Sequence, residues 1–251
     1  MPDWTKLSAS TQEFSFLLFE PFSNHVLANV LEPLRAANDL LGREVYRWKF
    51  LTVDGGTVRS SSGLPVMPRA ALGDEGEGDT LRVMPSYGYR GLASPYLRRA
   101  LRTASERYLW MAGIDCGAWL LADAGLLEDT RATIHYEEFE AFSERFPDVR
   151  ADRSRWVIED DRITAGGALP GFELVLHLIG ETHGTALTLE IAALFMSGSE
   201  RPSPGMVARD PLVARAVEMM HAHIERPWTI REICAVLGVH QVQLDRRLLF
   251  V

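Results

Sequence analysis

Hydrophobic residues in the N-terminal part of the chain form two kinds of run. Residues 14–19 and 81–84 are almost uninterrupted apolar runs, which are typical of strands buried on both faces of a sheet. Residues 24–41 and 95–107 instead place apolar side chains at helical spacing, and a glycine ends the first of these runs. Strands that alternate with helices predict an α/β fold, with a mostly parallel sheet covered by helices on both faces.

The rest of this part of the chain continues the alternation. Further strands are expected at residues 46–53, 107–111, 132–135, 156–159 and 162–164, an extended pair within 57–67, and helices at 119–125, 136–146, 169–181 and 186–196. Beyond them, residues 198–209 are rich in glycine, serine and proline without apolar periodicity, which indicates a linker. We therefore expect three parts: residues 1–197, the linker 198–209, and residues 210–251.

The C-terminal part predicts a small all-α domain. A helix at 211–224 is followed by a short helix at 230–237, a glycine turn and a polar-faced helix at 240–250. The last two are typical of a helix-turn-helix, although a helical hairpin packed on the sheet has the same spacing. As a recognition helix, the last one would present these side chains to the major groove: His240, Gln241, Gln243, Arg246 and Arg247.

Composition narrows the class of protein. The 251 residues are 47% hydrophobic and 24% charged, as in a globular protein, and the two cysteines are far apart, which favours a reducing cytoplasm. We expect no signal peptide and no membrane-spanning segment, because the N-terminal residues lack an apolar core and no apolar run is long enough to cross a membrane. The net charge of −8 argues against a general nucleic-acid binder but leaves room for a local basic patch.

Residues 112–122 are the segment most suggestive of function. A strand that turns through small residues directly into a helix projects its turn residue at the end of the sheet, where many α/β proteins expose a reactive or ligand-binding side chain. Here that residue is Asp115 or Cys116. The alternative is an ordinary strand-to-helix connection with a buried cysteine.

Together these segments resemble a known family, the GlxA-type branch of the AraC-family transcriptional regulators. The N-terminal domain of that branch resembles the flavodoxin-like fold of class I glutamine amidotransferases and intracellular proteases. The resemblance covers nearly the whole chain and lies in residues 32–38, 54–56, 58–63, 117–122, 124–127, 131–136, 142–147, 163–168, 183–184, 210–214 and 230–238.

The resemblance implies a sensor domain without catalysis. Enzymes of the superfamily carry a nucleophilic cysteine at the elbow and a histidine further along; here Asp115 matches the elbow, Cys116 follows it, and His135 matches the histidine. The loop that would supply an oxyanion hole contains Pro85 and Ser86, and a proline has no N–H to donate. We therefore expect no enzyme activity, cofactor or metal. The alternative is a hydrolase or hydratase that uses Cys116 and His135.

DNA binding is the second expectation from the resemblance. AraC-type domains resemble two helix-turn-helix units, whereas this chain carries one, and from Asp210 onward five acidic residues balance five arginines. We expect weak, strongly salt-dependent DNA binding if the chain is a truncated form, because phosphate neutralisation supplies most non-specific affinity. A DNA-incompetent partner of full-length relatives is a further alternative. A homodimer formed through the sensor domain is also expected.

The ligand is expected to be a small cation. Asp115 at the elbow and Glu32 on the first helix are carboxylates, and aromatic residues are expected around them, so the pocket would favour an amine, a betaine or an amino acid. Relatives in the family respond to such nitrogen compounds. The alternative is that Asp115 only caps the helix that begins beside it. The expected ligand-binding residues are Glu32, Pro85, Ser86, Asp115, Cys116, Trp119, His135 and Tyr136.

Overall fold

The computed structural model describes residues 11–74, 78–196, 212, 215–216, 219, 228–241 and 243–244. The chain divides into two compact units, Met1–Leu194 and Phe195–Val251. No helix in the described part of the chain is both long and apolar enough to cross a membrane.

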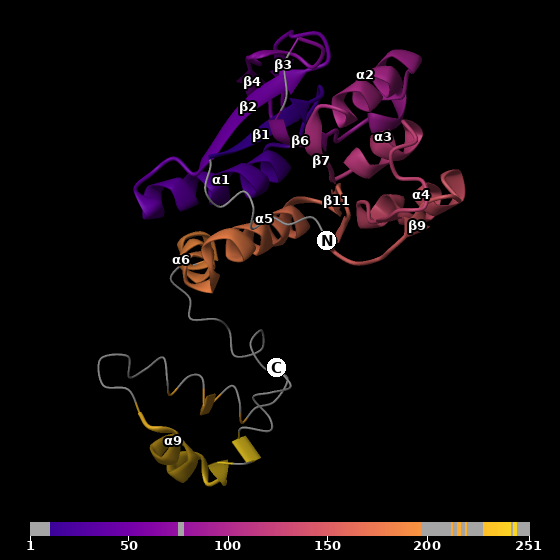
Figure 1. Cartoon of the computed structure of the whole chain (residues 1–251). Coiled ribbons are helices and arrows are strands. Elements are labelled where there is room, and N and C mark those ends of the chain that lie inside the picture. The colour runs from indigo at the N-terminus through magenta and orange to yellow at the C-terminus, as the bar shows by residue number, and fades with distance from the viewer. Residues whose placement is uncertain are drawn as a thin grey trace. The chain divides into compact units, whose positions relative to one another are not determined.

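A seven-stranded sheet forms the centre of the larger unit, as far as the structure describes it (Figure 1). Across the sheet the order is β10-β11-β7-β6-β1-β2-β5, and each neighbouring pair is parallel except the antiparallel pair β10–β11. The strands are β1 (Gln12–Leu18), β2 (Tyr46–Thr52), β5 (Ala70–Ala71), β6 (Gly78–Met84), β7 (Tyr108–Ile114), β10 (Trp156–Glu159) and β11 (Arg162–Ala165). Two short ladders lie outside this sheet: β3 (Val58–Arg59) with β4 (Pro65–Val66), and β8 (Arg131–Ala132) with β9 (Arg150–Ala151).

Helices cover both faces of the sheet, as the sequence pattern predicts. They are α1 (Asn24–Leu41), α2 (Pro95–Ser105), α3 (Gly117–Asp123), α4 (Phe139–Arg145), α5 (Ala168–His183) and α6 (Thr185–Met196), with the short 3-10 helices η2 (Tyr89–Leu92) and η3 (Tyr136–Glu138). One hydrophobic core joins the sheet to α1, α5 and α6, and a second joins it to α2, α3 and α4. Alternate residues of β1 serve the two cores: Phe16 faces the first and Leu17 the second, which explains why this strand is apolar throughout.

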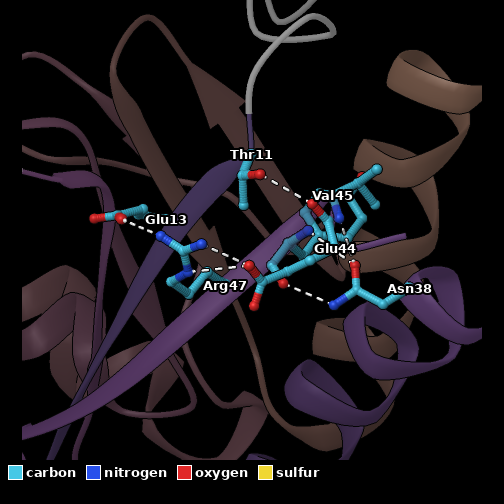
Figure 2. A network of polar contacts seen from close by, with 7 residues as sticks. Thr11, Glu13, Asn38, Glu44, Val45 and Arg47 are labelled. Carbon is cyan, nitrogen blue, oxygen red and sulfur yellow. Dashed lines mark hydrogen bonds and ion pairs between the residues drawn. The ribbon is translucent and has the colours of Figure 1, made fainter. Parts of the chain in front are cut away.

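Local sequence signals set the ends of α1 where they were predicted. The Ser23 side chain caps the helix by accepting a hydrogen bond from the Val26 N–H, and Gly42 ends it with a φ of 63°. Near its C-terminal end the Asn38 amide donates to the Tyr46 carbonyl at 2.7 Å and accepts from the N–H groups of Val45 and Tyr46 at 2.9 Å each (Figure 2). The helix is therefore fixed to the start of β2.

Several element boundaries differ from those predicted. β6 begins at Gly78 and not at residue 81, because Thr80 is polar yet buried, and such a residue interrupts an apolar pattern without ending a strand. β7 extends past residue 111 through small residues to Ile114. The strand expected at 132–135 is reduced to β8, the helix expected at 136–146 is divided into η3 and α4, and β5 was not predicted.

The described residues of the smaller unit include one complete helix, α9 (Ile230–Leu237). Thr229 and Glu232 cap its start reciprocally, and Gly238 turns the chain with a φ of 67°. Ala216, Ile233, Cys234 and Leu244 form a small core. The predicted short helix and glycine turn are thus present. Gln241 and Gln243 are helical, whereas Arg246, Arg247 and the expected linker lie outside the described residues.

Candidate functional site

The turn between β7 and α3 has the geometry of an elbow. Asp115 follows the last residue of β7 and has a φ of 62°, in the left-handed region. Aspartate is among the few residues other than glycine that adopt this region readily, although it costs roughly 1–2 kcal/mol. The sharp turn places Asp115 and Cys116 at the carboxyl end of the sheet, immediately before α3.

Two glycines make this elbow possible. A Cβ atom on Gly117 would lie 2.2 Å from the Val83 carbonyl oxygen, and one on Gly113 would lie 2.6 Å from the Ala118 nitrogen. Neither position can hold a larger side chain without moving backbone atoms. The small residues therefore allow α3 to pack directly onto β6 and β7.

A cavity of about 300 Å³ opens beside the elbow. Hydrogen bonds hold the elbow backbone on two sides: the Asp115 N–H donates to the Ala165 carbonyl at 2.9 Å, and the His135 N–H donates to the Asp115 carbonyl at 3.2 Å. The cavity is lined by Ser23, His25, Val26, Ser86, Tyr87, Tyr89, Asp115, Cys116, His135, Glu138, Gly167 and Ala168. Its wall thus comes from loops and helix N-termini that follow five different strands, β1, β6, β7, β8 and β11.

Asp115 is the most deeply buried carboxylate of the cavity wall, with 8% of its surface exposed. Burial raises the pKa of this carboxyl, while the nearby His135 and a hydrogen bond from Ser86 act in the opposite direction. In the described part of the chain the N-cap residue of α3 is Cys116 and not Asp115, and its side chain makes no capping hydrogen bond. The described residues therefore show no hydrogen bond by which Asp115 would cap α3.

Cys116 is poorly suited to nucleophilic chemistry. Its side chain is buried, and burial raises the pKa of the thiol far above its usual value, with the negative charges of Asp115 and Glu138 adding to the effect and Arg90 opposing it. The thiolate is the reactive form of cysteine, so the raised pKa disfavours the form that a nucleophile needs.

A polar cluster on η2 and η3 closes another part of the cavity wall. The Tyr89 hydroxyl donates to Glu138 Oε2 at 2.6 Å, Arg90 forms an ion pair with the same oxygen, and Arg90 Nε donates to the Tyr89 hydroxyl at 3.0 Å. Although partial burial acts against it, these hydrogen bonds lower the pKa of Glu138. Glu138 is therefore ionised and already paired with a cation.

Four of the residues expected from the sequence line the cavity: Ser86, Asp115, Cys116 and His135. Tyr136 is mostly exposed, and its ring lies 4.6 Å from that of His135. Trp119 is instead a core residue, with its ring 5.4 Å from the Tyr89 ring and 5.1 Å from the Phe146 ring.

Two further expected residues lie outside the cavity lining. Glu32 forms an ion pair of 2.6 Å with Arg35, one turn along α1, so its carboxylate is used on the helix surface. Pro85 lies next to the elbow: its Cδ atom is 3.6 Å from the position that a Cβ atom on Gly117 would occupy. Glu32, which was expected to bind the ligand, therefore does not line this cavity.

Sequence reasoning missed the contributions of two helix N-termini and of Glu138. His25 and Val26 come from the start of α1, and Gly167 and Ala168 from the start of α5. The available signal was topological, because the carboxyl ends of parallel strands gather at one edge of a sheet together with the helices that follow them. Among the described residues no group of three or more potential ligands is placed to hold a metal ion.

Comparison with known proteins identifies relatives along nearly all of the chain. The chain is 33% identical over 246 residues to the HTH-type transcriptional regulator CdhR of Pseudomonas aeruginosa, covering 94% of this chain and 73% of CdhR. It is 33% identical over 250 residues to the HTH-type transcriptional regulator GlxA of Rhizobium meliloti, covering 95% of this chain and 77% of GlxA. The chain matches no family model.

Solved structures agree with these relatives. An AraC-family transcriptional regulator from Pseudomonas putida has a TM-score of 0.64 and 27% identity, with 73% of this chain and 99% of that one covered. A ThiJ/PfpI-family protein from Pseudomonas syringae shares the fold, with a TM-score of 0.62 and 18% identity over 95% of this chain and 96% of that one. The chain therefore belongs to the HTH-type transcriptional regulators of the AraC family, in the branch that includes GlxA and CdhR.

Proposed function

We propose that this regulator responds to a small cationic nitrogen compound, here called the effector, that binds in the Asp115 cavity. The observation that carries the proposal is a buried carboxylate facing a cavity without an ion-pair partner. Among the described residues no lysine or arginine forms an ion pair with Asp115, although its surroundings disfavour its charge.

A cation in the cavity would compensate that charge. A buried carboxylate costs several kcal/mol unless it is paired and hydrogen-bonded, so a bound ammonium group would gain from the existing burial of Asp115. Glu138 is less available, since Arg90 and Tyr89 already contact it. Tyr87 and Tyr89 also line the cavity, and aromatic ring faces attract positive charge.

The same geometry supports a binding role without catalysis. The elbow position holds a carboxylate, the neighbouring Cys116 thiol has a raised pKa, and Pro85 in the preceding loop has no N–H to donate. We therefore expect no hydrolysis of amides and no hydration of nitriles. Thiol-dependent turnover that Cys116→Ser abolishes would contradict this expectation and favour the hydrolase or hydratase alternative.

DNA contacts are proposed for the helix that follows the Gly238 turn. Gln241 and Gln243 suit adenine edges, while Arg246 and Arg247 suit guanine edges or phosphates, with His240 at the start of the helix. Arg246→Ala and Arg247→Ala should each weaken binding to duplex DNA and reduce the salt dependence by about one ion if the arginine contacts a phosphate. Fluorescence anisotropy over a range of salt concentrations measures both quantities.

A homodimer formed through the larger unit is proposed as the working assembly, because most oligomers are two-fold symmetric and two recognition helices would reach one face of DNA. Light scattering at micromolar protein should report twice the monomer mass. A monomer under these conditions would count against this part of the proposal.

A melting screen tests the effector class. Small amines, betaines and amino acids at millimolar concentration should raise the Tm when they bind the folded state, and neutral analogues of the same shape should not. The proposal fails if none of the cationic compounds raises the Tm, or if neutral and cationic analogues act alike.

A further inference from the structure

The helix α6 carries apolar side chains on two opposite sides. On one side Leu187 and Ile191 are buried in the core that joins the sheet to α1, α5 and α6. On the opposite side, about half a turn around the helix, Leu189 is 65% exposed. Further exposed apolar residues lie beside it. We call this surface the outer face of α6, and it consists of Ala186, Leu189, Ala193 and Leu194.

Other helices of the larger unit carry charges where they face away from the sheet. On α1, Glu32 and Asp39 form ion pairs with Arg35, and on α2 the Arg102 side chain is exposed. α6 has one charged residue, Glu190, among its twelve. A surface helix normally places polar residues on its outer side, and a helix that is apolar all round is normally covered. The outer face of α6 is therefore expected to contact another surface.

This face is preformed, because α6 is fixed against α5 (Figure 1). The Thr188 hydroxyl donates to the Leu176 carbonyl at 3.5 Å, and a Cβ atom on Gly180 would lie 3.0 Å from the same hydroxyl oxygen. The two helices thus approach closely at Gly180, and Leu187 and Ile191 hold α6 in the core. A partner that binds here does not have to order the helix first, which lowers the cost of binding.

We propose that the outer face of α6 binds a second copy of this chain, with two α6 helices packed against each other across a two-fold axis. The inference rests on the homodimer of the proposed function and assigns it a surface. A two-fold interface brings the same patch of both subunits together. Leu189 lies near the middle of α6, so an axis beside it places the two Leu189 side chains next to each other.

Charge favours a second copy over other occupants. α6 contains no lysine or arginine, so its outer face suits neither DNA phosphates nor an anionic membrane surface. The chain carries a net charge of −8, so two copies repel each other unless they meet through an uncharged surface. The cores of homodimer interfaces are apolar and depleted in charged residues, as this face is.

The position of α6 in the chain supports the same choice. The larger unit ends at Leu194, and the chain continues into the smaller unit, which contains α9 and the Gly238 turn. Dimeric helix-turn-helix proteins place two recognition helices about 34 Å apart on DNA. A two-fold axis at α6 would start both smaller units from neighbouring points, as a pair of recognition helices requires.

Leu189→Glu tests the assigned surface. Because Leu189 is largely exposed, the change removes little packing, but at a two-fold axis it places two negative charges together. We expect the dimer dissociation constant from sedimentation to rise at least about tenfold, with an unchanged circular dichroism spectrum. Leu64→Glu is the matched control, since Leu64 is 54% exposed between β3 and β4 and this variant should stay dimeric.

The outcomes separate this inference from the proposed homodimer. If Leu189→Glu dimerises like the wild type, or if Leu64→Glu is the variant that dissociates, the assigned surface is wrong and the homodimer stands. If the wild type is a monomer at micromolar protein, the homodimer fails and the assigned surface fails with it.

A charge-pair experiment identifies the partner as a second copy. Leu189→Lys alone should dissociate for the same reason as Leu189→Glu. An equimolar mixture of the two variants should form a heterodimer, because opposite charges then face each other across the axis. Continued dissociation of the mixture would overturn the placement of the axis beside Leu189.

Discussion

Asp115 and Arg82 are both buried charged residues of the larger unit, yet their surroundings differ in kind. Arg82 lies on β6 with 1% of its surface exposed. Its Nη1 donates to the Val30 carbonyl at 2.9 Å, and its guanidinium carbon lies 4.5 Å from the centre of the Phe14 ring and 5.4 Å from that of the Phe16 ring. Burial lowers the pKa of Arg82 to about 9, with Tyr46 opposing the shift, so the side chain remains charged at neutral pH.

The difference between the two residues shows what makes a buried charge functional. Arg82 is surrounded by protein, and a carbonyl and two ring faces of the core compensate its charge. Asp115 faces a cavity, and its partners within the protein are a hydroxyl and a histidine. The charge of Arg82 is therefore compensated inside the core. The charge of Asp115 is not fully compensated by the protein, and the cavity beside it can hold a ligand that would pair with it.

The largest effect is expected from Arg82. Arg82→Ala should lower the free energy of unfolding by about 3–4 kcal/mol, because it removes a long side chain from a packed core. Arg82→Met should recover most of that loss, since apolar residues of similar volume often replace buried charges well. Denaturant titration measures both variants. If Met is as damaging as Ala, the charge of Arg82 matters more than its packing, and our comparison is wrong.

A smaller loss of stability is expected at the elbow. Gly117→Ala places a Cβ 2.2 Å from the Val83 carbonyl oxygen, where backbone atoms must move, so we expect a cost of about 2–3 kcal/mol. Gly91→Ala is the matched control, since a Cβ there meets no atom within 4 Å. Thermal unfolding compares the two, and equal Tm values would contradict the close packing of α3 on β6.

The pH dependence of stability should separate Asp115 from Glu138. The pKa of Asp115 is raised in the folded chain, so the folded state holds more protons, and this residue's contribution to stability falls as pH rises from about 4, its unfolded value, through the folded value. The pKa of Glu138 is lowered, so its contribution is present above about pH 4.3 and is lost as pH falls through the folded value.

Unfolding of Asp115→Asn and Glu138→Gln across this pH range provides the test. Relative to the wild type, the Asn variant should gain stability as pH rises, and the Gln variant should lose it. Parallel curves for the wild type and Asp115→Asn would show that burial of Asp115 does not disfavour its charge.

The smallest effect is expected from Cys116. Cys116→Ser exchanges one small buried side chain for another of similar size, so we expect a change in stability of about 1 kcal/mol or less and no effect on effector affinity. Calorimetry with the effector provides the check. A loss of binding would show that the Cys116 thiol, which lines the cavity, contacts the effector.

The sequence was most informative where local chemistry decides the structure. Ser23 and Gly42 mark the ends of α1 because capping depends on neighbouring residues in the chain, and the elbow at Asp115 follows from small residues between an apolar strand and a helix. The fold class follows for the same reason, since strand and helix periodicities are local patterns.

Contacts between residues far apart in the chain could not be predicted from the sequence. Glu32 was expected among the ligand-binding residues, but the way α1 packs on the sheet leaves it outside the cavity lining. Glu138 instead lines the cavity, because η3 brings it to Tyr89, 49 residues away in the chain. Arg82 interrupts the apolar pattern of β6. Only the packed structure shows that the Phe14 ring and the Val30 carbonyl contact its guanidinium group.

Calorimetry on the wild type and Asp115→Asn, with the tightest-binding cation from the melting screen, shows whether the charge of Asp115 recognises the effector. Asparagine keeps the shape of the side chain and tolerates the left-handed backbone at this position, so only the charge is removed. We predict that the variant folds as well as the wild type and binds the cation at least about tenfold more weakly, because a desolvated ion pair is lost. Equal affinity of the two proteins would contradict the claim that Asp115 recognises the effector.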